Sequence, residues 1–211
     1  MNTLKYIAGQ FEKPTGFGGQ ISTLIMNIIN RKMYSKTIDI LNITNKDTIL
    51  DIGFGNGKML KKISSFNPQK LYGIDISEDM LKSAIQLNTT AISANKMELF
   101  LADVQNLPFA DNFFDKIYTI NTVYFWQNYE NCFSEIKRIL KPDGLFINTC
   151  LTKKQLEKLI ITKYGFNKFT LEELKNLTEQ NGFSDVDIVE IEKDKSVCII
   201  AKNKKIGSVL I

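Results

Sequence analysis

The residues best suited to bind a ligand form a glycine-rich stretch, DIGFGNG, at residues 51–57. Its three glycines within five positions allow the backbone to approach a ligand closely. Two carboxylates, Asp75 and Asp103, follow at the ends of later apolar segments that have the composition of strands. A carboxylate about 20 residues after such a loop can accept hydrogen bonds from both hydroxyls of a ribose. The pattern therefore predicts a site for a nucleoside-like ligand.

Three kinds of ligand are compatible with a glycine-rich loop in general. A phosphate loop requires GxxxxGK followed by Ser or Thr, whereas Lys58 is followed here by Met59. A dinucleotide site requires GxGxxG, but Lys58 stands at the third glycine position counted from Gly53, and Asp51 would repel a pyrophosphate. A ligand with a ribose and a cationic group but no phosphate suits both Asp51 and Asp75. S-adenosylmethionine is such a ligand.

The composition restricts the chemistry that this 211-residue chain can perform. It contains no histidine, which excludes Ser-His-Asp and Cys-His catalysis and imidazole-ligated metals. Cys132, Cys150 and Cys198 form no CxxC pair, so the sequence predicts no metal site, and free thiols are typical of a reducing cytoplasm. The net charge of +4 is modest for nucleic-acid binding, and no apolar run has the length of a membrane span. We expect a cytoplasmic protein without nucleic-acid or stable membrane partners, and the oligomeric state stays open.

An alternation of strand-like and helix-like segments could position these residues. The expected strands are residues 48–53, 70–76, 97–104, 114–121 and 144–150, and the expected helices are residues 58–66, 77–87, 129–140, 152–160 and 170–181. Such alternation predicts crossover connections and an α/β fold with a doubly wound, mostly parallel sheet. Residues 186–192 and 196–202 are separated by so few residues that only an antiparallel hairpin can connect them.

The N-terminal 44 residues are predicted to form a helical cap segment that precedes a domain of residues 45–211. We expect a short helix over residues 1–10 and a break around Pro14. Apolar residues at helical spacing then predict a helix from Ile21 to about Leu41.

Four motifs in chain order resemble the class I S-adenosylmethionine-dependent methyltransferases. DIGFGNG is similar to their first motif, GIDIS to their ribose-binding segment, LADVQNLPF to the segment after their third strand, and IKRILKPDGLFI to the helix and strand after their fourth. Near the N-terminus, PxGxxG from Pro14 and MNxxN ending at Asn30 are similar to a lead-in of one group of small members. The resemblance implies a Rossmann-like seven-stranded sheet whose last strand is antiparallel.

The resemblance also implies which residues bind the cofactor, S-adenosyl-L-methionine. The implied cofactor-binding residues are Asp51, Gly53, Phe54, Gly55, Asp75, Ile76, Met80, Asp103, Val104 and Asn121. Asp103 would accept a hydrogen bond from the adenine amino group, Val104 would offer its backbone amide, and Met80 would lie against the adenine ring.

The acceptor is expected beside the stretch NTVYFW, residues 121–126. Its aromatic residues are either core packing or the wall of a pocket for a small, partly apolar acceptor, and Tyr124 could orient the nucleophile or take its proton. DNA amino-methyltransferases carry two prolines where Thr122 and Val123 stand here, which argues against DNA. The candidate substrate-binding residues are Asn30, Tyr124 and Trp126, and no catalytic residue is assigned.

The expected function is methyl transfer to a small molecule, with O-, N- and C-methylation left open. An NAD(P)-linked oxidoreductase and a non-catalytic module that binds S-adenosylmethionine are the alternatives.

Overall fold

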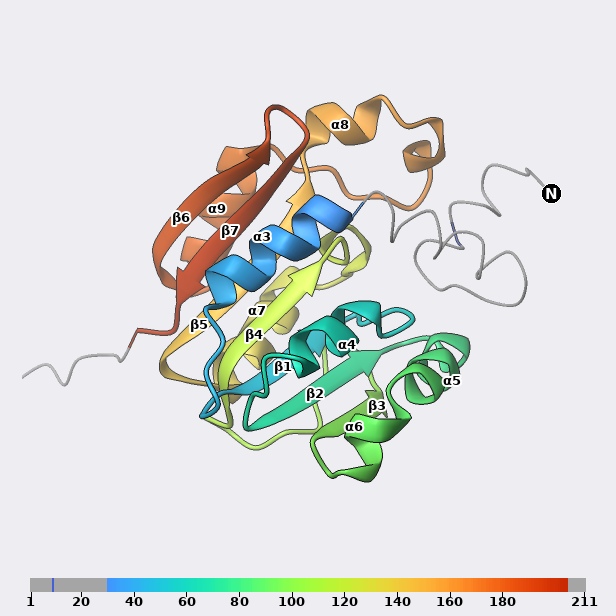
Figure 1. Cartoon of the computed structure of the whole chain (residues 1–211). Coiled ribbons are helices and arrows are strands. Elements are labelled where there is room, and N and C mark those ends of the chain that lie inside the picture. The colour runs from blue at the N-terminus through green and yellow to red at the C-terminus, as the bar shows by residue number, and fades with distance from the viewer. Residues whose placement is uncertain (1–8, 10–29, 205–211) are drawn as a thin grey trace, which may run out of the picture.

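The sheet that organises this chain has seven strands in the order β3-β2-β1-β4-β5-β7-β6 (Figure 1). It is seen in a computed structural model that describes Gly9 and residues 30–204. The first five strands of the chain pair in parallel, whereas β7 pairs antiparallel with both β5 and β6. The predicted mostly parallel sheet with a C-terminal antiparallel hairpin is therefore confirmed.

The strands are β1 (Thr48–Ile52), β2 (Lys70–Asp75), β3 (Met97–Leu101), β4 (Phe114–Ile120), β5 (Leu140–Leu151), β6 (Ser184–Glu192) and β7 (Ser196–Lys202). The α-helices are α3 (Arg31–Leu41), α4 (Lys58–Ser64), α5 (Glu78–Leu87), α6 (Thr89–Ser93), α7 (Tyr129–Ile139), α8 (Lys153–Glu157) and α9 (Leu171–Gln180). Two 3₁₀ helices are η1 (Val123–Phe125) and η2 (Ile160–Lys163). Helix α3 lies within the segment from Ile21 to about Leu41 that was predicted to be helical. Residues 21–29, the N-terminal motifs before Asn30 and nearly all of residues 1–10 lie outside the described residues.

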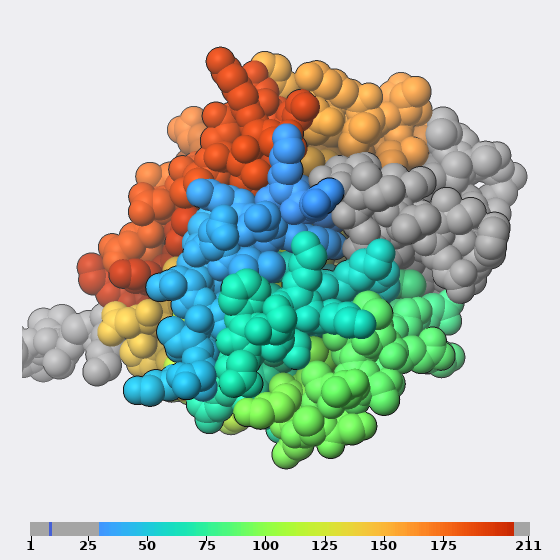
Figure 2. Space-filling model, viewed as in Figure 1, coloured from blue at the N-terminus to red at the C-terminus, as the bar shows by residue number. Residues whose placement is uncertain are grey.

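Helices cover both faces of the sheet. Helices α3, α4 and α5 pack on one face, where Leu41, Leu60 and Ala84 join a buried cluster, and Figure 2 shows α3 and α4 side by side on the surface of that layer. Helices α7 and α9 cover the other face, with Phe133 and Leu174 in its core. Among residues 30–204, no helix combines the length and the apolar character needed to cross a membrane.

Two predicted segments differ from the structure. The strand expected from residue 144 begins earlier, as β5 at Leu140, and the backbone of Asp143 and Gly144 hydrogen-bonds to Asn203 beyond β7. The helix expected over residues 152–160 ends earlier, as α8, and η2 follows it. Helix α6 was not expected at all. The start of β5 depends on a contact with a segment distant in sequence, whereas α6 and η2 are short local helical segments.

Side-chain hydrogen bonds cap the N-termini of two helices, α5 after β2 and α7 after β4. The Ser77 side chain accepts a hydrogen bond from the Met80 N–H and thereby caps α5. Asn128 caps α7 in the same way through the Asn131 N–H. These caps set the direction in which the chain leaves the loops after β2 and β4.

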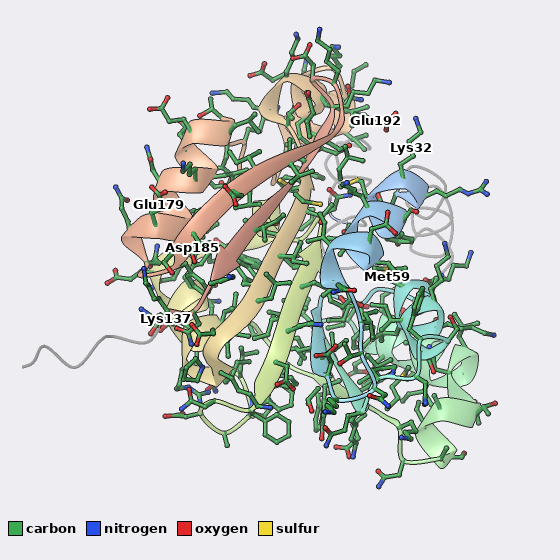
Figure 3. All side chains as sticks on the ribbon, turned by 60° about the vertical axis from the view of Figure 1, so that its left-hand side comes forward. Lys32, Met59, Lys137, Glu179, Asp185 and Glu192 are labelled. Carbon is green, nitrogen blue, oxygen red and sulfur yellow. The ribbon has the colours of Figure 1, made fainter. Side chains whose placement is uncertain are left out.

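An ion pair links the start of α3 to the far edge of the sheet. Lys32 Nζ lies 2.6 Å from Glu192 Oε2 at the end of β6 (Figure 3). The Lys32 side chain is 69% exposed, so we expect the pair to contribute little to the free energy of folding. The buried apolar residues of α3, including Met33, hold the helix on the sheet instead.

Candidate functional site

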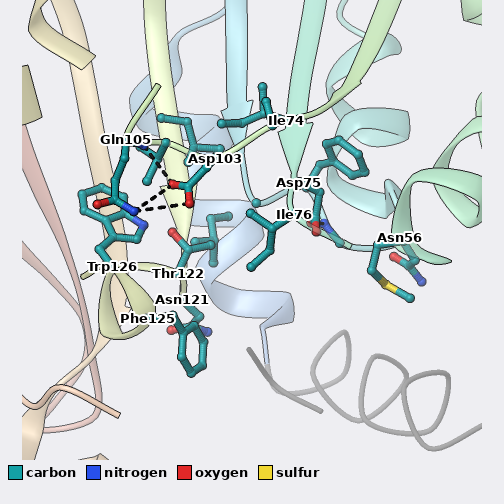
Figure 4. A pocket seen from close by; sticks show the side chains of 18 of the residues that line it. Asn56, Ile74, Asp75, Ile76, Asp103, Gln105, Asn121, Thr122, Phe125 and Trp126 are labelled. Carbon is teal, nitrogen blue, oxygen red and sulfur yellow. Dashed lines mark hydrogen bonds between the residues drawn. The ribbon is translucent and has the colours of Figure 1, made fainter. Parts of the chain in front are cut away.

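A pocket opens at the carboxyl ends of β1, β2, β3 and β4, where open α/β sheets bind their ligands (Figure 4). Its lining comes from five segments: Asn30 and Tyr34, residues 52–56, residues 74–76 with Met80, residues 102–105, and residues 120–122 with 125–127. All the predicted site residues line this pocket except Asp51 and Tyr124. The strand order therefore gathers motifs that are widely separated in the sequence.

The glycine-rich loop after β1 is shaped by residues with positive φ. Gly53 has φ 75° and Gly55 has φ 56°, values that favour glycine. The loop also approaches the end of β4 closely, because a Cβ atom on Gly53 would lie 2.3 Å from Thr122 Cγ2. Gly53 is thus required both by its backbone conformation and by its neighbour.

We expect the substitution Gly53→Ala to reduce the free energy of unfolding by about 1–3 kcal/mol, because it combines a strained φ with a steric clash. Thermal unfolding measures this loss. Gly165→Ala is the matched control: Gly165 also has a positive φ, of 70°, but a Cβ atom added there would meet no neighbour within 4 Å. Equal destabilisation by the two substitutions would show that the contact with Thr122 has no effect.

Asp75 at the end of β2 connects the loops that follow β1 and β2. Its Oδ2 accepts a hydrogen bond from the Gly55 N–H at 2.8 Å, and its Oδ1 accepts one from the Ser77 N–H at 2.9 Å. The residue is only 7% exposed, so it is held in one orientation. A carboxylate can accept hydrogen bonds from several directions, and Asp75 lines the pocket.

Asp103 also lines the pocket, two residues after β3. It is exposed, and its carboxylate accepts hydrogen bonds from the backbone N–H and the side-chain Nε2 of Gln105 (Figure 4). Gln105 also lines the pocket and was not predicted as a site residue. The only sequence signal that could have identified Gln105 was its position within LADVQNLPF. The orientation of its side chain could not be predicted, because it depends on the turn at Asp103.

Asp51 lies beneath the pocket rather than in its wall. It is 3% exposed, and its Oδ2 accepts a hydrogen bond of 2.6 Å from the hydroxyl of Tyr118 on β4. Burial raises the pKa of Asp51 to about 8, while the bond from Tyr118 opposes that rise. Tyr118 was not identified from the sequence, because it becomes a neighbour of Asp51 only when β1 pairs with β4.

A hydrogen-bonded group of side chains closes the β4 end of the pocket. Asn121 Nδ2 donates to Asn30 Oδ1 at 2.8 Å, which joins the end of β4 to the residue that precedes α3. The Tyr124 hydroxyl donates to Asn121 Oδ1, also at 2.8 Å. Tyr124 is 2% exposed and lies behind Asn121, and its burial raises the pKa of its hydroxyl well above the usual value.

The aromatic wall of the pocket is formed by Phe125 and Trp126. Phe125 packs against Phe166 with 4.7 Å between ring centroids. The Asn167 N–H donates to the Tyr124 carbonyl, so two consecutive residues of the connection between η2 and α9 hold this wall. Phe166 and Asn167 belong to no motif, and the sequence offered no signal for their role.

The charge of the pocket favours a cationic ligand. Asp75 and Asp103 carry the only formal charges among its described lining residues, which include no lysine or arginine. A pyrophosphate is usually bound by cationic side chains or a helix N-terminus, whereas a sulfonium or ammonium group suits a pocket with two carboxylates. Within residues 30–204, no group of three or more potential metal-binding side chains comes together.

Comparison with known proteins gives a consistent result. Residues 50–148 match the family model described as "Methyltransferase domain". The chain is 31% identical over 188 residues to the uncharacterized methyltransferase YdaC of Bacillus subtilis (strain 168), a match that covers 86% of this chain and 97% of that protein. It is 30% identical over 125 residues to a sterol 24-C-methyltransferase of Pneumocystis carinii (strain B80), which covers 59% of this chain but only 31% of the sterol enzyme.

A solved structure supports the fold. The SAM-dependent methyltransferase from Aquifex aeolicus has a TM-score of 0.69 to this chain with 22% sequence identity, over 80% of this chain and 88% of that protein. At this identity the similarity concerns the fold. The seven-stranded arrangement is therefore that of a known architecture.

Proposed function

The chain belongs to the class I S-adenosylmethionine-dependent methyltransferases, and from that premise we propose that it methylates a small-molecule acceptor bound at the end of β4. The observation that carries the proposal is the division of the pocket into two parts. Carboxylates and the glycine loop lie at the ends of β1, β2 and β3, whereas Phe125, Trp126 and uncharged polar side chains lie at the end of β4.

The first part of the pocket is suited to the cofactor. When bound, S-adenosylmethionine supplies a methyl group on a sulfonium that is a good leaving group. We propose that Asp75 accepts the ribose hydroxyls, that Asp103 and Val104 bind the adenine, and that the loop from Gly53 to Gly55 accommodates the amino-acid part. Asp51 would act from beneath that loop through its charge.

The second part is suited to the acceptor. Phe125 and Trp126 would exclude water and bind an apolar portion, while Asn30 and Asn121 would orient a polar group. Holding two reactants in line can lower a barrier by up to roughly 7–11 kcal/mol in favourable cases. Orientation is therefore the main contribution that we propose for these residues, and the acceptor atom stays open between oxygen, nitrogen and carbon.

The remaining expectations are consistent with this proposal. The three cysteines are free and buried, which suits the cytoplasmic location that we propose. We propose a function without nucleic-acid partners, because the pocket is acidic. We also retain the division into a segment of residues 1–44 and a domain of residues 45–211. Helix α3 of that segment packs on the sheet of the domain.

Calorimetric titration of the full chain tests the cofactor and acceptor assignments. We expect S-adenosylhomocysteine to bind and NAD to give no heat, because the pocket combines two carboxylates with no described cationic side chain. A screen of small acceptors should then show release of S-adenosylhomocysteine from S-adenosylmethionine. Binding of NAD, or an absence of heat with S-adenosylhomocysteine on folded protein, would contradict the proposal. Turnover with a macromolecule alone would contradict the small-molecule acceptor.

A further inference from the structure

We propose that Tyr124 is a positioning residue, whose hydroxyl fixes the side-chain amide of Asn121 and, through it, that of Asn30 at the reacting end of the pocket. The inference rests on the proposed function for the identity of the ligand. The sequence suggested that Tyr124 forms the pocket wall, orients the nucleophile or takes its proton, whereas here its hydroxyl acts on Asn121 and not on the acceptor.

The backbone of Asn121 is held in an uncommon conformation. Its φ of 59° lies in the left-handed region, which asparagine adopts more readily than most residues. Its N–H donates to the Thr149 carbonyl at 2.9 Å, so the residue is attached to β5 directly after β4 ends. The side chain of Asn121 is thereby directed toward α3 and the pocket, where it forms part of the lining.

The hydrogen-bond partners of Asn121 determine which way its amide faces. The Leu151 N–H can only donate, and it lies 3.2 Å from Asn121 Oδ1. The Tyr124 hydroxyl donates to the same oxygen. A flipped amide would place its NH₂ group against the Leu151 N–H, so the oxygen must face this pair of donors.

The orientation of Asn121 then determines that of Asn30. Asn121 Nδ2 donates to Asn30 Oδ1, which leaves the NH₂ group of Asn30 on the other side of that residue. A side-chain hydrogen bond between Asn30 and Tyr34 lowers the pKa of Tyr34, against the burial that raises it to about 12. One series of hydrogen bonds thus runs from Leu151 through Tyr124 and Asn121 to the residues at the start of α3.

The ring and the hydroxyl of Tyr124 make different contacts, so their effects can be tested separately. Its ring packs against Phe125 and Phe166, with centroid distances of 6.0 and 5.8 Å. Its hydroxyl bonds to Asn121 and to the backbone of Leu151. Tyr124→Phe therefore keeps the ring contacts and removes one of the two donors to Asn121 Oδ1, together with the bond between the hydroxyl and the Leu151 backbone.

The test compares two probes in wild-type protein and Tyr124→Phe by calorimetry. S-adenosylhomocysteine has no substituent in the methyl position, whereas sinefungin carries an amine there. We expect Tyr124→Phe to reduce the affinity for sinefungin relative to that for S-adenosylhomocysteine by about three- to tenfold, the effect of one weakened hydrogen bond. Equal losses for both probes, or no change in their ratio, would overturn the proposal.

Tyr129→Phe is the matched control. Tyr129 also belongs to the aromatic group, but its hydroxyl donates to the Val123 carbonyl and accepts from Asn167 Nδ2, whereas that of Tyr124 donates to Asn121. We expect this variant to keep the wild-type ratio of affinities, and a change as large as that of Tyr124→Phe would overturn the proposal.

A second measurement uses the ligand-free protein. In Tyr124→Phe, the side-chain NH₂ protons of Asn121 and Asn30 should exchange with solvent faster than in wild type, as followed by NMR. Unchanged exchange would overturn the positioning role. Failure of wild-type protein to bind either probe would instead contradict the proposed function, so the two ideas fail on different observations.

Discussion

Replacing Asp75 by alanine is expected to weaken the binding of S-adenosylhomocysteine by about 1.5–3 kcal/mol, or roughly 10- to 150-fold in the dissociation constant. Hydrogen bonds to a charged group fall in this range, and the Asp75 carboxylate would accept one from each ribose hydroxyl. The same carboxylate orders the loop that binds the amino-acid part, because it accepts from the Gly55 N–H. Calorimetric titration of the two proteins measures the difference directly.

Glu78→Ala is the matched control for this substitution. Glu78 lies three residues further along the chain in the first turn of α5, its side chain is 71% exposed, and it does not line the pocket. Removing its charge should leave the dissociation constant near the wild-type value. A similar loss in both variants would mean that general charge, rather than contact with the ribose, controls binding. An unchanged constant in Asp75→Ala would remove Asp75 from the site.

The sequence was most informative where the chemistry lies directly after a strand. The loop from Gly53 to Gly55 and the carboxylate Asp75 are local features, and parallel strands bring their carboxyl ends to one edge of the sheet. The expected alternation of strands and helices was therefore enough to place these residues around one pocket. The same reasoning placed Asn121 there.

The residues that the sequence could not identify depend on contacts between distant segments. Tyr118 becomes the partner of Asp51 through strand pairing, and Phe166 supports Phe125 through a connection between α8 and α9. The stretch from residue 121 to residue 126 shows the limit most clearly. Its aromatic residues could not be divided by pattern alone, and it is η1 that buries Tyr124 while Phe125 and Trp126 face the pocket.

Cofactor binding is expected to become tighter with increasing pH in the wild-type protein but not in Asp51→Asn. Burial raises the pKa of Asp51 to about 8, so this group is mostly protonated in the ligand-free protein at neutral pH. A cationic ammonium or sulfonium group above it would favour the carboxylate and release the proton. By linkage, affinity would rise by up to about tenfold per pH unit between roughly pH 6 and 8.

The same shift predicts the pH dependence of folding stability. A carboxyl group whose folded pKa is raised contributes stability below its unfolded pKa, about 3.9, and loses that contribution as pH rises through about 8. The free energy of unfolding of the ligand-free protein should therefore decrease over this interval. Asp51→Asn should flatten the profile, because its amide has no proton to lose and can still accept from Tyr118.

Calorimetry in buffers with different ionisation enthalpies counts the protons released on binding and so tests the role of Asp51. Wild-type protein should release a proton near pH 7 that Asp51→Asn does not. The ligand's own α-amino group titrates near pH 8, and comparison of the two proteins removes its contribution. Asp185→Asn, which changes an exposed carboxylate on β6 away from the pocket (Figure 3), should behave as wild type. If Asp51→Asn releases as many protons as wild type, Asp51 does not sense the cofactor, and its bond to Tyr118 serves only to join β1 to β4.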